Sequence, residues 1–156
     1  MRRKDREVTD CGRIKEMIEA CRCCRLGFYD GSEVYIVPMD FGYEEYDGKR
    51  VFYFHSAKKG RKMELIAKTH AAGFELDTNH ELVEGKSACE YTSRYQSVIG
   101  TGKVTLVEGE KKKIKALQSI MFHSTGRNDW EFPSAAIENV CVFQLEVEKL
   151  SCKEHR

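Results

Sequence analysis

The sequence predicts a single mainly-β domain, an antiparallel β-barrel with peripheral helices. Apolar and polar residues alternate over several stretches, which is the period of a strand buried on one face. Short turn signals such as Asp30-Gly31-Ser32 and Asp47-Gly48 separate these stretches. Because strands joined by tight turns pair antiparallel, these patterns favour an antiparallel barrel over a parallel, doubly wound sheet.

Composition and charge limit the classes of function. The chain has 156 residues, 41% hydrophobic and 33% charged, which suits one globular domain with a real core. Its net charge of +1 gives no general attraction to nucleic acid or to an anionic membrane. The basic start, residues 1–8, lacks the apolar stretch of a secretory signal, so we expect a flexible arm, a barrel over 9–150 and a cytoplasmic location.

The first third of the chain predicts one helix followed by strands. Thr9 or Asp10 can cap a helix that runs to about Cys23. Residues 26–41, LGFYDGSEVYIVPMDF, predict two strands joined by a turn, and Pro38 places the second at an edge, a bulge or a break. Residues 42–49, GYEEYDGK, are expected to form a loop. Residues 51–54, VFYF, predict a third strand.

The rest of the chain predicts two more helices and several strands. A short helix is expected over 63–68, weaker strands over 71–77 and 81–84, and a long strand over 95–107. Gly100 and Gly102 in the long strand indicate a bulge or a close approach of another backbone or a ligand. A helix is expected over 110–122, with these residues facing inward: Ile114, Leu117, Met121 and Phe122. Residues 141–147 alternate as a final, half-exposed strand.

Seven cysteines raise the question of a metal or disulfide framework. Without an export signal, free thiols are the expected state. The motif CxCC at Cys21, Cys23 and Cys24 is not followed by a second CxxC or HxxxH pair, which a zinc site usually needs. We therefore expect no metal site.

The stretch FHSAKKGRK, residues 54–62, is the clearest candidate for an anion site. It follows a predicted strand and opens a predicted helix, whose free N–H groups and partial positive charge favour phosphate. Ser56 can donate a hydrogen bond, Arg61 can bind two phosphate oxygens and Lys62 adds a point charge. The alternative is a solvated basic helix start. His55 is either a proton donor near neutral pH or a structural histidine.

Three segments together resemble the nitroimidazole-resistance (Nim) proteins, a family within the pyridoxamine 5′-phosphate oxidase-like flavoproteins. They are YIVPMDFGY, FYFHSAKKGRKMELI and ACEYTSRYQSVIGTGKV, and the resemblance covers about residues 9–150. It implies an FMN-binding split β-barrel of Greek-key type, a homodimer with the flavin at the subunit interface. The final LEVEKLSCKEHR lacks the basic residues that bind substrate phosphate in pyridoxamine phosphate oxidases, so that oxidation is not expected.

The resemblance also implies which residues bind the flavin. Arg61 and Lys62 match the pair that holds the FMN phosphate, and His55 matches a histidine near the ring. Val37, Pro38, Met39 and Asp40 match the segment along the isoalloxazine. The remaining implied residues are Phe54, Ser56, Ser97, Val98 and Trp130. Trp130 either walls the pocket of the partner subunit or belongs to core or dimer packing.

Two classes of function remain open at this point. The first is a flavin-dependent reductase that passes electrons from a donor such as NAD(P)H to a small planar acceptor, with His55 as its catalytic residue. The second is a non-enzymatic carrier or sensor of FMN or another flat anion such as heme. A nucleic-acid binder using the basic N-terminus is disfavoured by the near-neutral charge.

Overall fold

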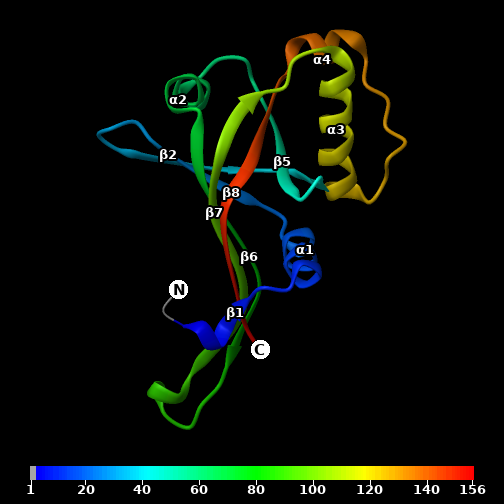
Figure 1. The fold of residues 1–156 in the computed structure, drawn as a ribbon. Helices are drawn as coiled ribbons and strands as arrows, with labels where there is room; N and C mark the ends of the chain where they lie inside the picture. The colour runs from blue at the N-terminus through cyan, green and yellow to red at the C-terminus, as the bar shows by residue number, and fades with distance from the viewer. Residues whose placement is uncertain (1–2) are drawn as a thin grey trace.

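A computed structural model describes residues 3–156 (Figure 1). The elements are η1 (Lys4–Arg6), β1 (Glu7–Val8), α1 (Cys11–Ala20), β2 (Cys24–Tyr29), β3 (Val34–Met39), β4 (Gly42–Tyr46), β5 (Lys49–Ser56), α2 (Arg61–Thr69), β6 (Ala71–Val83), η2 (Ala88–Glu90), β7 (Thr92–Leu106), α3 (Glu110–Thr125), α4 (Ser134–Asn139) and β8 (Cys141–His155). No helix in this described part of the chain is long and apolar enough to span a membrane.

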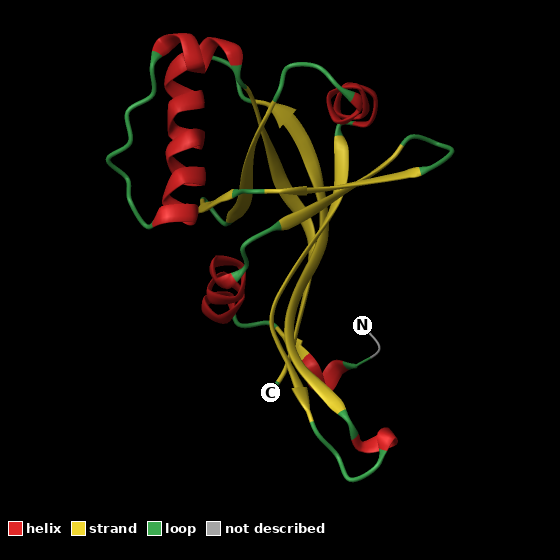
Figure 2. Ribbon diagram, turned by 180° about the vertical axis from the view of Figure 1, so that it is seen from behind, coloured by secondary structure: helices red, strands yellow, loops and turns green. Residues whose placement is uncertain are grey.

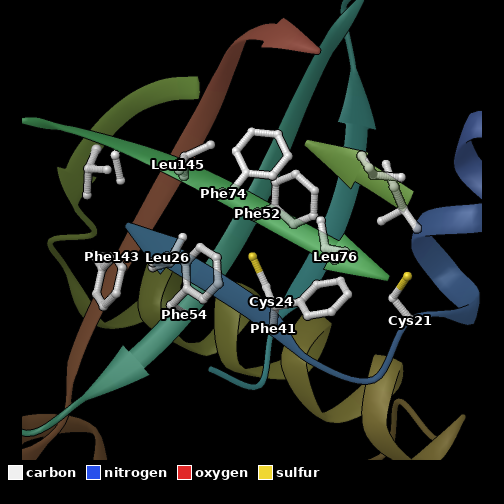
Figure 3. Packing of buried hydrophobic residues seen from close by; sticks show 14 of the residues in the cluster. Cys21, Cys24, Leu26, Phe41, Phe52, Phe54, Phe74, Leu76, Phe143 and Leu145 are labelled. Atoms are coloured by element: carbon white, nitrogen blue, oxygen red, sulfur yellow. The ribbon is translucent and has the colours of Figure 1, made fainter. Parts of the chain in front are cut away.

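The strands form one antiparallel sheet that curls around the core. Their order is β3-β2-β6-β7-β8-β5-β4, and β1 pairs with β8. Three strands separate β2 from β5 in this order. Nevertheless, Leu26 of β2 and Phe52 and Phe54 of β5 belong to one buried cluster (Figure 3). Such a cluster is possible only if the sheet bends back on itself, which confirms the predicted mainly-β fold with peripheral helices.

Strand β5 is apolar on both faces because each face is covered. Phe52 and Phe54 point into the core, whereas Val51 and Tyr53 pack against Ala116 and Ile120 of α3 in a second cluster. The four residues are at most 6% exposed. This explains why VFYF is a continuous apolar run instead of an alternating one. Figure 2 shows α3 lying along one side of the sheet.

The predicted glycine effect in the long strand is confirmed. The register of β7 against β8 shifts between Thr101 and Gly102. A Cβ at Gly100 would lie 2.2 Å from the Lys149 carbonyl oxygen, and one at Gly102 would lie 2.3 Å from that of Glu146. Only glycine allows this close approach of the two backbones.

Three predictions about elements were wrong. Residues 42–46, expected in a loop, form β4, which pairs with β5 through a turn with positive φ at Asp47 and Gly48. The two weak strands at 71–84 are one strand, β6, with a register shift between Thr78 and Glu81. In α3 the fully buried residues are Ala116 and Ile120; of the residues predicted to face inward, Leu117 packs against them, whereas Phe122 is 55% exposed.

The N-terminal segment also differs from the predicted flexible arm. Glu7 and Val8 form β1 and pair with Lys153 and Cys152 of β8. The sheet therefore extends beyond residue 150, to His155. Residues 1–2 of the predicted arm lie outside the described part of the chain.

Candidate functional site

A cleft of about 580 Å³ lies where the ends of β3 and β5 meet the start of α2 and the short helix α4. Its lining residues are Pro38, Met39, Asp40, His55, Ser56, Ala57, Lys62, Ala136, Asn139 and Val140. Six of these were predicted as site residues from the sequence. The fold therefore brings together side chains that are up to 102 positions apart in the chain, from Pro38 to Val140.

One wall of the cleft is the end of an edge strand. Strand β3 pairs with β2 alone in the described sheet, so its outer edge offers backbone N–H and C=O groups to a ligand. Pro38 sits on this strand, opposite Arg25, and its missing N–H is tolerated at an edge. Of the three predicted places for Pro38, an edge, a bulge or a break, the structure shows the edge.

His55 stands at the opposite wall, near the end of β5. Its backbone pairs with Val142 of β8, which fixes the position of the residue, whereas its side chain is exposed to the cleft. Within residues 3–156 the imidazole makes no hydrogen bond or ion pair with another side chain or the backbone. The ring is therefore free to contact a molecule bound in the cleft.

Lys62 brings positive charge into the cleft. It is the second residue of α2, is half-buried, and its Nζ lies 3.1 Å from the Met39 Sδ. No carboxylate lies within ion-pair distance of this ammonium group in the described structure. Burial lowers the pKa of Lys62, because the charged form loses solvation that no acid replaces. An anionic ligand group would supply the missing partner.

Arg61, the neighbouring cation, points elsewhere. Its guanidinium forms an ion pair with Glu33, lies 3.7 Å from the Asp30 Oδ2, and stacks over the Tyr35 ring at 5.5 Å. The Glu33 hydrogen bond is the main reason that the pKa of Arg61 is raised. Arg61 is thus at the start of α2 as predicted but outside the lining of the cleft.

The start of α2 leaves backbone donors available. Gly60 precedes the helix with φ at 125°, a conformation that side chains rarely adopt, and a Cβ there would meet open space. No side chain of the described residues caps this helix. The Met63 N donates to the Gly60 carbonyl oxygen at 2.9 Å, so among the described residues the free N–H groups at the start of α2 are those of Arg61 and Lys62.

Four predicted residues do not reach the cleft within one chain. The Phe54 ring points into the core, where it stacks on Phe143 at 5.2 Å (Figure 3). Val37 packs against the same core. Ser97 and the buried Val98 pair with Lys153 and Cys152. Lys153 and Cys152 lie 12 and 11 residues along β8 from Cys141, which pairs with Ser56 at the cleft. At about 3.3 Å per residue, Ser97 and Val98 are therefore about 40 Å from the cleft along the sheet.

Trp130 also lies outside the cleft of its own chain. It is in the loop between α3 and α4, where its Nε1 donates to the Thr125 Oγ1 at 3.2 Å. The guanidinium of Arg127 stacks over its ring at 4.6 Å. In this chain the tryptophan is therefore held by local contacts at the C-terminal end of α3.

Helix α4 also lines the cleft, although no site residue was predicted there. This helix has only six residues, too few for a periodic pattern, yet it supplies Ala136 and Asn139 to the cleft. One signal was present: Pro133 directly precedes it, and proline is common where helices begin.

A larger cavity, of about 680 Å³, lies at the opposite end of the molecule, between β1 and the end of β8. Arginine and acidic side chains line it, and most of them are paired with one another. None of the predicted site residues borders it. We therefore place the functional site at the cleft beside His55.

The fold and the cleft define a class of protein: a curled antiparallel barrel with a cleft where a strand end meets a helix start. Within this class, the chain belongs to the pyridoxamine 5′-phosphate oxidase family, whose sequence profile matches residues 10–154. No curated protein sequence gives a significant match.

Solved structures agree with this assignment. A candidate 5-nitroimidazole antibiotic resistance protein from Bacteroides thetaiotaomicron VPI-5482 is 30% identical, with a TM-score of 0.82 over 94% of this chain and 85% of that chain. The resemblance noted in the sequence is thereby confirmed. The flavocytochrome Anf3 from Azotobacter vinelandii is 19% identical, with a TM-score of 0.81 over 100% of this chain and 72% of that one. A FAD and heme binding protein from Mycobacterium smegmatis is 13% identical, with a TM-score of 0.83 over 97% and 74%.

Proposed function

We propose that the protein binds FMN in the cleft and acts as a flavin-dependent reductase of small planar acceptors, such as nitroaromatics or quinones. One observation carries the proposal: the cleft joins an open backbone edge, an exposed histidine and a lysine without an acidic partner at the start of a helix. Family membership supports it, and so do relatives whose descriptions name flavins.

The residues present fit a flavin mononucleotide. The volume of about 580 Å³ lies within the range of roughly 300–1,000 Å³ that is usual for small-molecule sites. Lys62 and the free N–H groups of α2 suit a phosphate. The unpaired edge of β3 suits the polar edge of a heteroaromatic ring, and Met39 and Val140 would supply apolar contacts to it.

Each group of the chain would then have a distinct task. Bound FMN would supply the redox chemistry, accepting electrons from a donor such as NAD(P)H and passing them to the acceptor. Lys62 would neutralise the phosphate, and the β3 edge would orient the ring. His55 would hold a proton at its imidazole for delivery to the acceptor as the acceptor gains electrons.

We further propose a cytoplasmic homodimer with the flavin at the interface. The cleft is open to solvent on one side, and Ser97, Val98 and Trp130 lie away from it in the same chain. A second copy packed across the opening could bring such residues to the flavin and exclude water from it.

A second candidate is a non-enzymatic carrier or sensor. Two relatives are described as a flavocytochrome and as a FAD and heme binding protein, so the fold accommodates more than one flat anionic ligand. In that case the chain would bind flavin or heme without turnover.

The visible absorption spectrum tests the cofactor assignment first. The purified protein, mixed with FMN and then desalted, is expected to retain oxidised-flavin bands at about one flavin per subunit. The double variant Arg61→Ala/Lys62→Ala should weaken FMN binding at least about tenfold, because charge-assisted hydrogen bonds to phosphate are lost. The matched control Lys111→Ala/Lys112→Ala removes two exposed cations from the start of α3 and should leave affinity unchanged.

Unchanged FMN affinity in the Arg61/Lys62 variant would contradict the phosphate assignment. Anaerobic titration with NADH or NADPH then separates the two candidate functions. Bleaching of the flavin followed by reoxidation with a nitroaromatic or quinone supports the reductase. A flavin that no nicotinamide donor reduces supports the carrier.

A further inference from the structure

Cationic side chains at both ends of helix α2 bind the turn between β2 and β3. At its start, Arg61 pairs with Glu33 and lies 3.7 Å from Asp30. At its end, the Lys68 Nζ donates to the Asp30 carbonyl oxygen at 2.6 Å. The turn that carries Glu33 therefore lies beside the same helix start that we assign to the flavin phosphate.

The two acidic side chains of this turn, Asp30 and Glu33, differ in how firmly the turn holds them. The Asp30 Oδ1 accepts hydrogen bonds from the Ser32 N at 2.8 Å, the Ser32 Oγ at 2.7 Å and the Glu33 N at 3.0 Å, so its carboxylate shapes the turn. The Glu33 side chain is 61% exposed, and Arg61 is its only side-chain partner among residues 3–156. Glu33 can thus release Arg61 without disturbing the turn, whereas Asp30 cannot move with it.

The contrast with Lys62 shows what the pairing does. Arg61 and Lys62 are the first two residues of α2, yet only Lys62 lines the cleft. A guanidinium binds a carboxylate and a phosphate through the same planar N–H groups, so it cannot serve Glu33 and a phosphate fully at once. The exposed Arg61–Glu33 pair is of the weak kind that a phosphate can displace.

We propose that Glu33 is a specificity-determining residue that competes with the ligand phosphate for Arg61. It keeps the guanidinium outside the cleft until a phosphate-bearing flavin draws the guanidinium from Glu33 into the cleft. A flavin without phosphate leaves Arg61 on Glu33. The inference rests on the proposed flavin site, and what it adds is that Arg61 exchanges the Glu33 carboxylate for the flavin phosphate.

The test compares FMN with riboflavin, which has the same ring and lacks the phosphate. Dissociation constants are measured by quenching of flavin fluorescence for the wild type and for Glu33→Gln. The substitution should tighten FMN binding about two- to fivefold, the range expected for loss of an exposed competing ion pair, and leave riboflavin binding unchanged. The control Glu81→Gln, which breaks the comparably exposed Glu81–Arg94 pair between β6 and β7, should change neither affinity.

A double-mutant cycle makes the assignment specific. In an Arg61→Ala background, Glu33→Gln should no longer affect FMN affinity, because the competition acts through the missing guanidinium. An unchanged ratio of FMN to riboflavin affinity in Glu33→Gln, with FMN still bound, would overturn this inference alone. Failure of the wild type to bind FMN at all would overturn the proposed function and the inference with it.

Discussion

At the cleft, residues that are adjacent in the sequence differ sharply in burial. Phe54 is buried in the core, and His55, the next residue, is exposed to the cleft. This follows from the alternation of a strand, since consecutive side chains point to opposite faces. The same backbone that anchors Phe54 against Phe143 therefore holds His55 in a fixed place.

Replacing His55 with alanine should separate catalysis from binding. We expect the variant to retain FMN and to lose about 10²-fold in kcat with a quinone or nitroaromatic, because a positioned proton donor is removed. Steady-state kinetics and a pH profile of kcat measure this effect. Turnover that equals the wild type, with the same pH profile, would make His55 a structural residue.

The glycines of β7 give a prediction about stability. Gly102→Ala should lower the free energy of unfolding by about 1–3 kcal/mol, because its Cβ would lie 2.3 Å from a backbone carbonyl oxygen. Gly27→Ala is the matched control on β2, where the nearest atom to the new Cβ is 3.9 Å away. Chemical denaturation of both variants provides the comparison. Equal stability of the two would contradict the close approach.

At the scale of elements, a row of hydrogen-bonded polar side chains connects β6, β7 and β8 to α1. The Asn79 Nδ2 of β6 donates to the Gln96 Oε1 at 2.8 Å, and the Gln96 Nε2 donates to the Glu154 Oε1 at 2.7 Å. Glu154 also accepts from Arg13 of α1. Because Gln96 is 6% exposed, these bonds replace the water that its amide loses on burial.

These hydrogen bonds at Glu154 predict that the stability of the protein depends on pH. The Arg13 hydrogen bond, helped by those of Gln96 and Arg156, lowers the pKa of Glu154 from 4.5 to about 2. A lowered pKa contributes stability that is fully present above pH 4.5 and is lost as the pH falls toward 2. Glu154→Gln should therefore cost on the order of 2 kcal/mol at neutral pH and reduce the loss of stability in acid.

Denaturant unfolding at several pH values between neutrality and the acid range measures this effect. The control Glu81→Gln removes the acid of an exposed pair with Arg94 and should change stability by less than about 1 kcal/mol at any pH. If Glu154→Gln keeps the same acid sensitivity as the wild type, the stabilising role of this carboxylate is refuted.

For the whole molecule, the outer face of the β2–β3 hairpin is unusually apolar. Tyr29, Val34 and Ile36 are 62%, 64% and 64% exposed, and Tyr29 pairs directly with Val34. Figure 1 shows this hairpin projecting from the body of the sheet. Exposed apolar residues gathered on one face are typical of a surface that another protein covers.

The proposed homodimer can be tested at this face. Ile36→Lys should convert a dimer into a monomer and weaken FMN binding, because a charge would be buried at the interface. Sedimentation velocity gives the oligomeric state. Phe122→Lys, at an exposed position of α3, is the control and should leave the dimer intact. A wild-type protein that sediments as a monomer would contradict the proposal.

Much of the fold was predictable because its signals are local. Asp10 caps α1 as expected, with the Arg13 N donating to its Oδ1 at 2.7 Å, and the alternation over 95–107 corresponds to β7. The signals failed where packing decides. Helix α3 turns Ala116 toward the sheet because small groups permit close approach: a Cβ at Gly42 would lie 2.6 Å from the Ile120 backbone. A count of large apolar residues does not detect such a contact.

The site was predictable in part for a similar reason. The ends of β3 and β5 and the start of α2 are each marked by a local pattern, and the fold brings Pro38, His55 and Lys62 to one cleft. The direction of Arg61 could not be read from the sequence, since it depends on Glu33 28 positions earlier. Ser97 and Val98 would reach a flavin only in the proposed homodimer, and no pattern in one chain reports how two copies pack.

Strand β8 pairs with β7 along one edge from Phe143 to His155, and along the other edge it pairs with β5 over Cys141–Glu146 and with β1 at Cys152 and Lys153. The amide protons of residues 143–146, which lie between two strands, should therefore exchange with heavy water only when the whole domain opens, whereas those on the outer edge of β3 should exchange within local fluctuations. Because residues 143–146 pair with the strand that carries His55, the wall behind His55 should belong to the slowly exchanging part of the sheet.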